Sequence, residues 1–376
     1  MKSQFIVVLV MWCIGLTSEA SIIRADVSDP PTSAILLDAP MPDQVGIAAY
    51  THVAAVQPGR MWRSYASRSY TYTAFLPLLN TVLPWAIINT REAARSFYLT
   101  NYVSSTSGIL INWTGSYPSC IPGTTSVTFR DAVLRRLNFY RAMAGVPAIT
   151  RFSDDYNRLS QAAALMMARN SNLSHSPPAA WDCYSSDGYT GAGSSNLALG
   201  AYGTAAIDLY IRDFGAGNTA VGHRRWVLYP QTQEMGTGDA PNISGYYQAN
   251  SLHAWDSHIW EPRPGTRDPY VAWPPAGYVP YQIVAARWSF SYPGATFANA
   301  VVSMMQDSTP VAVAQSVPAY GYGENTLVWI PNGMSDSNIW PKPATDITYH
   351  ITINHVLISG QDRTFVYDVT VFDPQQ

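Results

Sequence analysis

Charged side chains are scarce in this chain of 376 residues. Asp, Glu, Lys and Arg make up 12% of it, half of the ~25% that is typical of soluble domains. The formal net charge is −3, so the chain has no basic excess that would attract nucleic acid or an anionic membrane. We therefore expect no nucleic acid among its partners.

Long apolar runs are also missing, except near the first residue. The stretch from Phe5 to Leu16 is almost entirely apolar, follows Lys2 and precedes the small residues Ser18 and Ala20. This order is typical of a secretory signal peptide, here residues 1–20, and the run is too short to span a bilayer. We expect a secreted, extracellular protein without a transmembrane segment.

Cysteine is rare, with three in the chain. Cys13 lies in the predicted signal peptide and would be removed with it, which leaves Cys120 and Cys183. In an oxidising compartment these two residues are expected to form one disulfide. Two buried free thiols are the alternative.

Proline and glycine divide the rest of the chain into regions of different character. Residues 21–119 carry short apolar runs between Pro, Gly, Ser and Asn, which predicts a β-containing N-terminal region with one short helical start at Thr90–Arg95. A Pro-rich linker is predicted at residues 259–280. From residue 281 to 376, apolar residues alternate with a period of two, as in an antiparallel β-sandwich.

Helical spacing dominates the region between, residues 120–258. Apolar residues at this spacing begin near Val127 and end at Gly145, and a second helix is predicted from Ser153. A third is predicted from Thr204 to Asp213. The Gly- and Ser-rich stretch from Gly191 to Asn196 is predicted to be an irregular loop.

Two histidines lie at the edges of these predicted helices. His223 follows Gly222 in a short helical turn that ends before Pro230, and His175 lies between the second and third helices. Imidazole titrates near neutral pH and readily binds zinc, so the pair predicts a shared cleft for a ligand or for proton transfer. The alternative is that each ring bonds a loop carbonyl and serves the structure.

Five short motifs occur in a set order along this region, namely Leu137-Asn138-Phe139-Tyr140-Arg141, Gly145, His175-Ser176, Asn196-Leu197, and Gly222-His223-Arg224 before a Gly-x-Gly strand. Their order and spacing resemble the CAP superfamily, which includes cysteine-rich secretory proteins, insect venom antigens and plant pathogenesis-related proteins. A Gly-His-Arg turn is typical of its many bacterial members. The resemblance covers residues 120–255, about a third of the chain.

This resemblance implies a central sheet with helices on both faces and an open cleft formed by two histidines and two acidic residues. His175 and His223 fall on the two histidine positions, between which family members can bind a divalent metal, usually zinc. Ser195, before Asn196, replaces the first acid, and Asp213 matches the second. We expect an α+β chain in which a CAP-like α-β-α sandwich precedes a C-terminal antiparallel β-sandwich.

The leading hypothesis is a secreted CAP-domain protein that binds an extracellular small molecule, lipid, glycan or peptide. The predicted ligand cleft contains His175, His223, Asp213, Ser195 and Asn196. Two imidazoles and one short carboxylate leave an open coordination sphere. No cofactor is therefore required by this hypothesis, and zinc is expected to bind at the two histidines only modestly.

Two alternatives come from other classes of protein. The first is an extracellular hydrolase or peptidase in which His223 is the base, Asp213 orients it, and Ser195 or a metal completes the site. Ser195 lacks the Gly-x-Ser-x-Gly context of a nucleophile elbow, so we favour binding over catalysis. The second is a surface adhesion protein with a vestigial cleft, whose β-sandwich makes the contacts.

Overall fold

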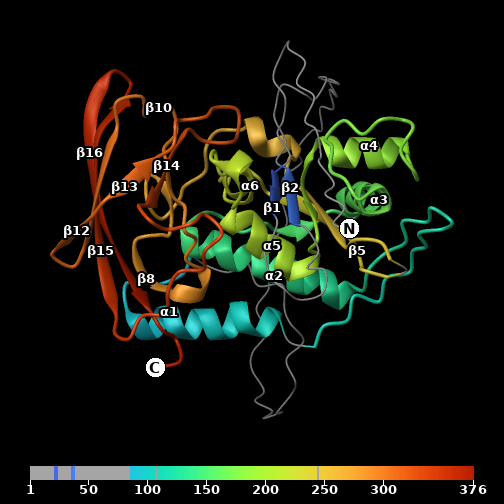
Figure 1. Ribbon diagram of the computed structural model, residues 1–376, viewed down its shortest axis with the longest axis horizontal. Coiled ribbons are helices and arrows are strands. Elements are labelled where there is room, and N and C mark those ends of the chain that lie inside the picture. The colour runs from blue at the N-terminus through green and yellow to red at the C-terminus, as the bar shows by residue number, and fades with distance from the viewer. Residues whose placement is uncertain (1–20, 24–34, 39–84, 107, 244) are drawn as a thin grey trace, which may run out of the picture.

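The computed structural model describes residues 21–23, 35–38, 85–106, 108–243 and 245–376. The predicted signal peptide, residues 1–20, and much of the predicted N-terminal region lie outside these ranges. No helix in the described ranges is both long enough and apolar enough to cross a bilayer. Figure 1 shows two units side by side, one built from helices around a sheet and one built from strands.

The centre of the first unit is a six-stranded sheet with the order β1-β2-β4-β6-β5-β3. Its strands are β1 (Ser21–Ile23), β2 (Ile35–Asp38), β3 (Arg151–Phe152), β4 (Ser195–Leu199), β5 (Glu234–Ala240) and β6 (Ala249–His253). Neighbours pair antiparallel except β3 and β5, which run parallel. β4 and β6 are therefore central strands, and every residue of both is buried.

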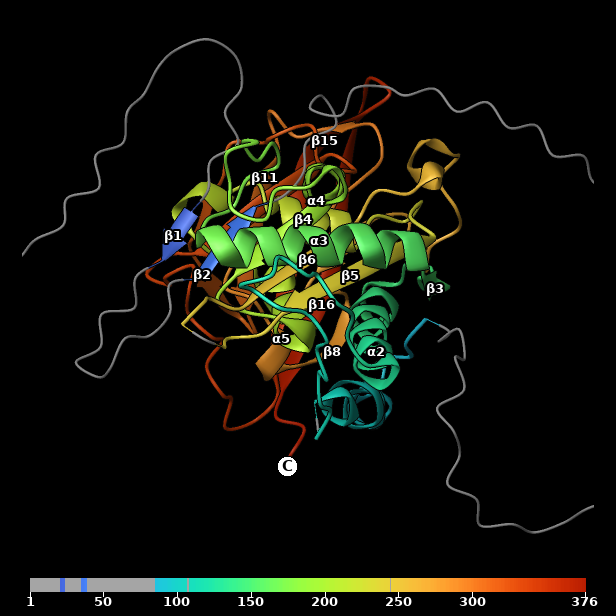
Figure 2. The same cartoon turned by 90° about the vertical axis from the view of Figure 1, so that its right-hand side faces the viewer.

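Helices cover both faces of this sheet. On one face lie α3 (Asp154–Asn170) and α4 (Ser186–Gly193), and on the other lie α2 (Val127–Ala144), α5 (Gly203–Arg212) and α6 (Gly222–Val227). Alternation along β4 matches this division, because Leu197 packs with the apolar side chains of α3 whereas Ala198 packs with those of α2 and α5. Figure 2 shows α3 crossing in front of β4, β6 and β5. The expected α-β-α arrangement is confirmed.

Local sequence signals explain where the predicted helices begin and end. The hydroxyl of Ser126 accepts a hydrogen bond from the amide of Phe129 at the start of α2, and Gly145 ends the helix with a φ of 76°. α3 begins directly after Ser153, as predicted. The third and fourth predicted helices appear as α5 and α6.

The predicted irregular loop from Gly191 to Asn196 is wrong. Residues 191–193 form the last turn of α4, and β4 begins at Ser195. The glycines serve packing here, since a Cβ atom on Gly191 would lie 2.3 Å from the carbonyl oxygen of Leu159 on α3. Gly238 on β5 plays the same part, because its Cβ would lie 2.1 Å from the backbone of Ser160. Glycine thus lets α3 lie directly against both α4 and the sheet.

The second unit consists of two sheets packed face to face, with strand orders β12-β11-β15-β16-β8 and β13-β14-β9-β7, while β10 also pairs with β15. Its strands are β7 (Val271–Trp273), β8 (Gly277–Pro280), β9 (Trp288–Ser291), β10 (Ala295–Thr296), β11 (Val301–Gln306), β12 (Thr309–Val311), β13 (Val313–Gln315), β14 (Thr326–Pro331), β15 (Ile347–Ile358) and β16 (Gln361–Phe372). All pairs are antiparallel except β8 with β16. Across the two sheets, the ring of Trp288 lies 5.6 Å from that of Tyr349 and the ring of Phe290 lies 4.9 Å from that of Phe365.

The sandwich begins earlier in the chain than residue 281, its predicted first residue. β7 and β8 lie within residues 259–280, the segment predicted as a linker, and pair with β9 and β16. Four short 3-10 helices complete the described chain: η3 (Val103–Ser105), η4 (Ala216–Asn218), η5 (Ser257–Trp260) and η6 (Tyr281–Ile283).

Residues 85–106 join the two units. The segment contains α1 (Arg91–Phe97), capped by the hydroxyl of Thr90, and the π-helix η2 (Tyr98–Tyr102). Phe97 stacks on Phe139 of α2 with ring centres 5.4 Å apart. The guanidinium of Arg91 forms an ion pair with Asp346 at 3.1 Å, next to the C-terminal sheet. This segment therefore contacts both units at once, as Figure 1 also shows.

Candidate functional site

His223 and Asp213 form the best defined pair among the predicted site residues. His223 is the second residue of α6 and is buried, and its Nδ1 lies 2.7 Å from the Oδ1 of Asp213. Asp213 caps the end of α5 in a left-handed conformation, and its Oδ2 accepts the backbone N–H of Arg224 at 3.2 Å. A carboxylate only accepts hydrogen bonds, so Nδ1 of the imidazole carries the hydrogen. The contact fixes both the tautomer and the direction of the ring.

The other ring nitrogen of His223, Nε2, is buried and has no hydrogen-bond partner among the residues that the structure describes. Tyr210 stacks on the imidazole with a centroid distance of 5.6 Å and an interplanar angle of 12°. The Tyr210 hydroxyl is itself held, since it donates to the backbone oxygen of Asn196 at 3.0 Å. The ring is therefore held in a fixed orientation, with its Nε2 in contact with no described hydrogen-bonding group.

Asn196 also contacts this cluster. Its Nδ2 donates to the backbone oxygen of His223 at 3.1 Å, which ties the start of β4 to the start of α6. The structure thus brings three of the five predicted cleft residues together, namely Asn196, Asp213 and His223.

His175 lies in the loop between α3 and α4 and contacts the last turn of α4. It is buried, and its Nδ1 lies 2.7 Å from the backbone oxygen of Ala192 in the last turn of α4. β4 begins three residues after Ala192, so His175 is placed beside the start of the strand that carries Asn196. A direct meeting of the His175 and His223 rings stays a prediction.

Ser195 has a different neighbour from the one expected. In the β4–β6 ladder it is paired with His253, and its buried Oγ makes no hydrogen bond to any described residue. Strand alternation directs Ser195 to the face covered by α3, whereas the adjacent Asn196 points to the face of α6. No hydrogen bond links the Ser195 Oγ with the Nε2 of His223, so the contact between nucleophile and base is not formed.

His253 is a buried residue whose surroundings the sequence did not reveal. Its ring stacks on Tyr156 of α3 at 4.0 Å, and its Nε2 bonds the backbone oxygen of Trp255 at 2.7 Å. Burial lowers the pKa of His253 to about 4. The imidazole is therefore neutral at physiological pH and acts as a packed aromatic ring.

A zinc site with three or more protein ligands does not fit the described residues. Nowhere in these ranges do three or more His, Cys, Asp or Glu side chains come close enough to hold a metal ion. This agrees with the chemistry of the donor set, because Asp213 is occupied by His223 and by the amide of Arg224. Metal binding by His175 and His223 alone stays a prediction.

Two arginines connect the His223–Asp213 pair to the sandwich. Arg287, just before β9, donates to the backbone oxygen of Asp213 at 2.9 Å and forms an ion pair with Asp336 at 2.7 Å. Arg224 donates to the hydroxyl of Ser289 at 2.9 Å. Both guanidinium groups are buried. Arg287 was not among the predicted site residues, because a lone arginine 64 positions after His223 gives no local signal.

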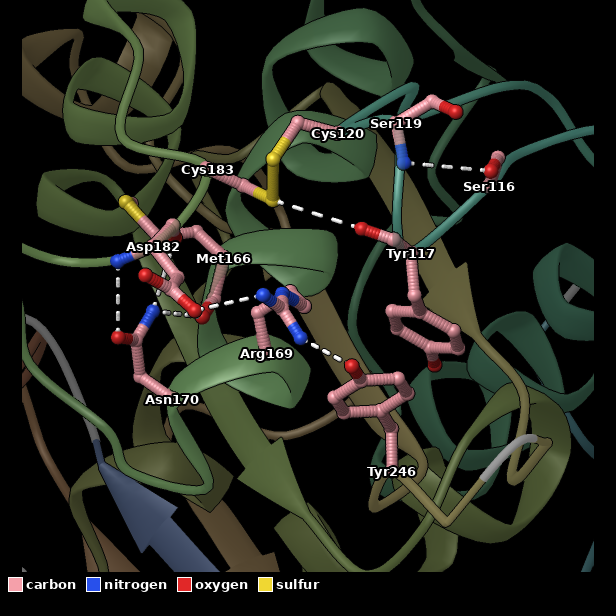
Figure 3. Close-up of a disulfide and its surroundings, with 10 residues drawn as sticks. All are labelled: Ser116, Tyr117, Ser119, Cys120, Met166, Arg169, Asn170, Asp182, Cys183 and Tyr246. Atoms are coloured by element: carbon pink, nitrogen blue, oxygen red, sulfur yellow. Dashed lines mark hydrogen bonds and ion pairs between the residues drawn. A yellow bond between two sulfur atoms is a disulfide. The ribbon is translucent and has the colours of Figure 1, made fainter.

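The predicted disulfide between Cys120 and Cys183 is present, with an S–S distance of 2.04 Å. It ties the segment before α2 to the loop between α3 and α4, as Figure 3 shows. The same loop carries His175. Ion pairing of Arg169 with Asp182 at 2.6 Å holds the same loop against the end of α3. The covalent and ionic contacts therefore hold two adjacent residues of this loop, Asp182 and Cys183.

Comparison with known protein families agrees with this architecture. The model of the cysteine-rich secretory protein family, CAP, matches residues 134–260. The matched range contains α3 to α6, β4 to β6, His175 and the His223–Asp213 pair. No curated protein matches the chain. Together, the family match and the α-β-α arrangement identify residues 134–260 as a CAP domain, followed in this chain by a C-terminal antiparallel sheet structure.

Proposed function

We propose that this chain is a secreted CAP-domain protein that binds an extracellular ligand beside His223. One observation carries the proposal: Asp213 holds Nδ1 of the ring, while the buried Nε2 has no partner in the described ranges. A buried polar atom without a hydrogen bond costs about 1–3 kcal/mol. Such exceptions call for an explanation, and a ligand that completes the hydrogen bond supplies one.

The free lone pair specifies what the ligand must offer. Nε2 of this tautomer accepts a hydrogen bond, so the ligand places an O–H or N–H donor against it. Glycan and sterol hydroxyls, peptide amides and a protonated lipid head group all meet this requirement. We propose that the cleft includes His175, which lies at the other side of the start of β4.

Hydrolysis is a second candidate because the Asp213–His223 contact matches an orienting acid and a base. The nucleophile is the missing part, since the Oγ of Ser195 lies on the ladder beside His253. Turnover of peptide or ester substrates by the purified chain, abolished in His223→Ala, would establish this function. Unchanged turnover in that variant would refute it.

Binding is tested with the purified full chain and a panel of lipids, glycans and peptides. We expect saturable binding that His223→Ala and Asp213→Asn weaken, because one removes the acceptor and the other frees the ring to change tautomer. His350→Ala is the matched control, since this histidine is exposed on β15 and pairs with Asp368. Equal binding by all four proteins, or binding by none, would contradict the proposal.

Metal binding and export are separate parts of the proposal with tests of their own. Zinc titration by calorimetry is expected to give weak binding that is lost in His175→Ala and in His223→Ala. Zinc binding that survives both substitutions would refute the proposed two-histidine site.

Export is tested by N-terminal sequencing of the exported protein. We expect its sequence to begin at Ser21, after the predicted signal peptide.

A further inference from the structure

A cavity of about 330 Å³, lined by both apolar and charged groups, lies in the first unit, partly outside the CAP domain, and shares no residue with the His223–Asp213 pair. Its walls are residues 122–125 before α2, Arg130 near the start of α2, one side of α3 between Asp154 and Ala162, Asp187 in the first turn of α4, and Thr237 of β5. The volume is at the lower end of the range for small-molecule sites. No large aromatic side chain lines the cavity.

Two arginines and two aspartates line this cavity, and one residue of each kind is already ion-paired. Arg158 on α3 forms an ion pair with Asp187 on α4. Arg130 and Asp154 have no oppositely charged side chain within 4.0 Å in the described chain. The cavity therefore holds one unpaired cation and one unpaired anion.

Arg130 has hydrogen-bonding capacity left over. Its Nη1 donates to the backbone oxygen of Thr125, and its Nε and Nη2 donate to no described residue. The nearby buried carboxylate, Asp239, is satisfied without it, because Asp239 accepts from the amide of Gly203 at 2.6 Å and from Nδ2 of Asn250 at 2.8 Å. The guanidinium of Arg130 is therefore available to a ligand.

A third group supplies a neutral donor. The Oδ1 of Asn157 accepts the backbone N–H of Thr237 at 2.9 Å, which fixes the amide and leaves its Nδ2 without an acceptor among the described residues. Asn157 lies one helical turn after Asp154 on the same side of α3. The cavity therefore offers three free groups: the cation of Arg130 on α2, and the anion of Asp154 and the amide donor of Asn157 on α3.

The walls of the cavity are fixed before any ligand arrives. The disulfide joins Cys120, two residues before Pro122, to Cys183, four residues before Asp187. The amide of Thr124 donates to the hydroxyl of Thr114 at 2.9 Å. Pre-formed walls reduce the entropy that binding would otherwise cost.

We propose that this cavity binds a small zwitterion, a short polar molecule with an ammonium group at one end and a carboxylate at the other. The carboxylate pairs with the planar guanidinium of Arg130, the ammonium pairs with Asp154, and Nδ2 of Asn157 donates to a carbonyl oxygen. Free amino acids and short peptides with unblocked ends share this chemistry. The site is independent of the ligand proposed for the His223 cleft.

Calorimetry on the full chain at low salt tests the proposal with glycine, diglycine, triglycine and tetraglycine. Each peptide is compared with its N-acetylated and C-amidated form. We expect saturable binding of at least one unblocked compound and weakening by about tenfold or more when either end is blocked. The preferred length separates a free amino acid from a peptide. Absence of binding by all unblocked compounds, or equal binding of the blocked forms, would overturn the proposal.

Variants assign the binding to this cavity. Arg130→Gln and Asp154→Asn are each expected to weaken binding by about tenfold or more. Asp131→Asn is the matched control, because Asp131 is exposed on α2 beside Arg130 and does not line the cavity. His223→Ala is expected to leave the affinity unchanged, so the two proposed sites can fail separately. Wild-type affinity in both cavity variants would overturn the assignment.

Discussion

The acid sensitivity of the CAP domain can be worked out from His253. Burial lowers the pKa of this imidazole to about 4 from an ordinary value of 6.5. Between these two values the unfolded chain binds a proton that the folded chain does not bind. The contribution of this group to the free energy of unfolding is therefore complete above pH 6.5 and is lost as the pH falls toward 4.

The size of the effect follows from the two pKa values. Relative to pH 8, the shift removes about 2 kcal/mol at pH 5 and about 3 kcal/mol at pH 4. His253→Phe keeps the stack on Tyr156 and removes the titrating group. The variant also loses the hydrogen bond to the backbone of Trp255, which costs about 1 kcal/mol at every pH. Its stability is thus lower at pH 8 and less dependent on pH.

Urea unfolding of both proteins from pH 4 to pH 8 measures this difference. The free energy of unfolding of the wild type minus that of His253→Phe is expected to fall by about 2 kcal/mol between pH 8 and pH 5. His258→Gln is the control of opposite sign. Contact with Asp256 raises the pKa of His258, so its contribution is present at low pH and is lost as the pH rises through that raised pKa. A difference between wild type and His253→Phe that does not change with pH would refute the buried, neutral state of His253.

Three further predictions concern stability. Gly238→Ala is expected to lower the free energy of unfolding by about 2 kcal/mol or more, because its Cβ would lie 2.1 Å from the backbone of α3, whereas Gly265→Ala, with open space around it, should change it by less than about 0.5 kcal/mol; equal effects would contradict the close approach of α3 to β5. Arg287→Ala is expected to cost about 3 kcal/mol in chemical denaturation, because it leaves the backbone oxygen of Asp213 without this donor and Asp336 with only the amide of Gly215; a neutral result would show that the sandwich does not support the site. Replacing Cys120 and Cys183 by serine opens a link across 63 residues and is expected to cost about 4 kcal/mol; a loss below about 1 kcal/mol would contradict a role for the disulfide in stability.

Helices that carry their own boundary signals could be predicted from the sequence. The hydroxyl at Ser126 and the glycine at position 145 bracket α2, and both act through residues at most four positions away. The alternating strands of the sandwich were predictable for the same reason, since one buried and one exposed face give a period of two. Local signals therefore suffice where one element determines its own ends.

The remainder depended on contacts between distant segments. Gly191 reads as a loop residue, yet its lack of a Cβ serves the approach of α4 to Leu159. Ser195 reads as a substitute for a cleft acid, yet the register of β4 against β6 places it opposite His253. Neither the register of β4 against β6 nor the contact between α3 and α4 can be predicted from the residues next to Ser195 or Gly191.

The candidate site was predictable only in part. The family resemblance led to His223 and Asp213, and the structure places them 2.7 Å apart. Arg287, which holds Asp213 from the sandwich, could not be found in this way because it lies outside the matched range of residues 134–260. This chain therefore differs from an isolated CAP domain, because the second unit contributes a contact to the candidate site.

The most direct test of whether Asp213 orients His223 is to determine which ring nitrogen of His223 carries the hydrogen. Long-range ¹H–¹⁵N correlation NMR on protein labelled at histidine distinguishes the two neutral tautomers. We expect hydrogen on Nδ1 and a bare Nε2 in the wild type, and a change of this pattern in Asp213→Asn. A wild-type ring with hydrogen on Nε2 and a bare Nδ1 would contradict the account, because Asp213 could then not be the group that orients His223.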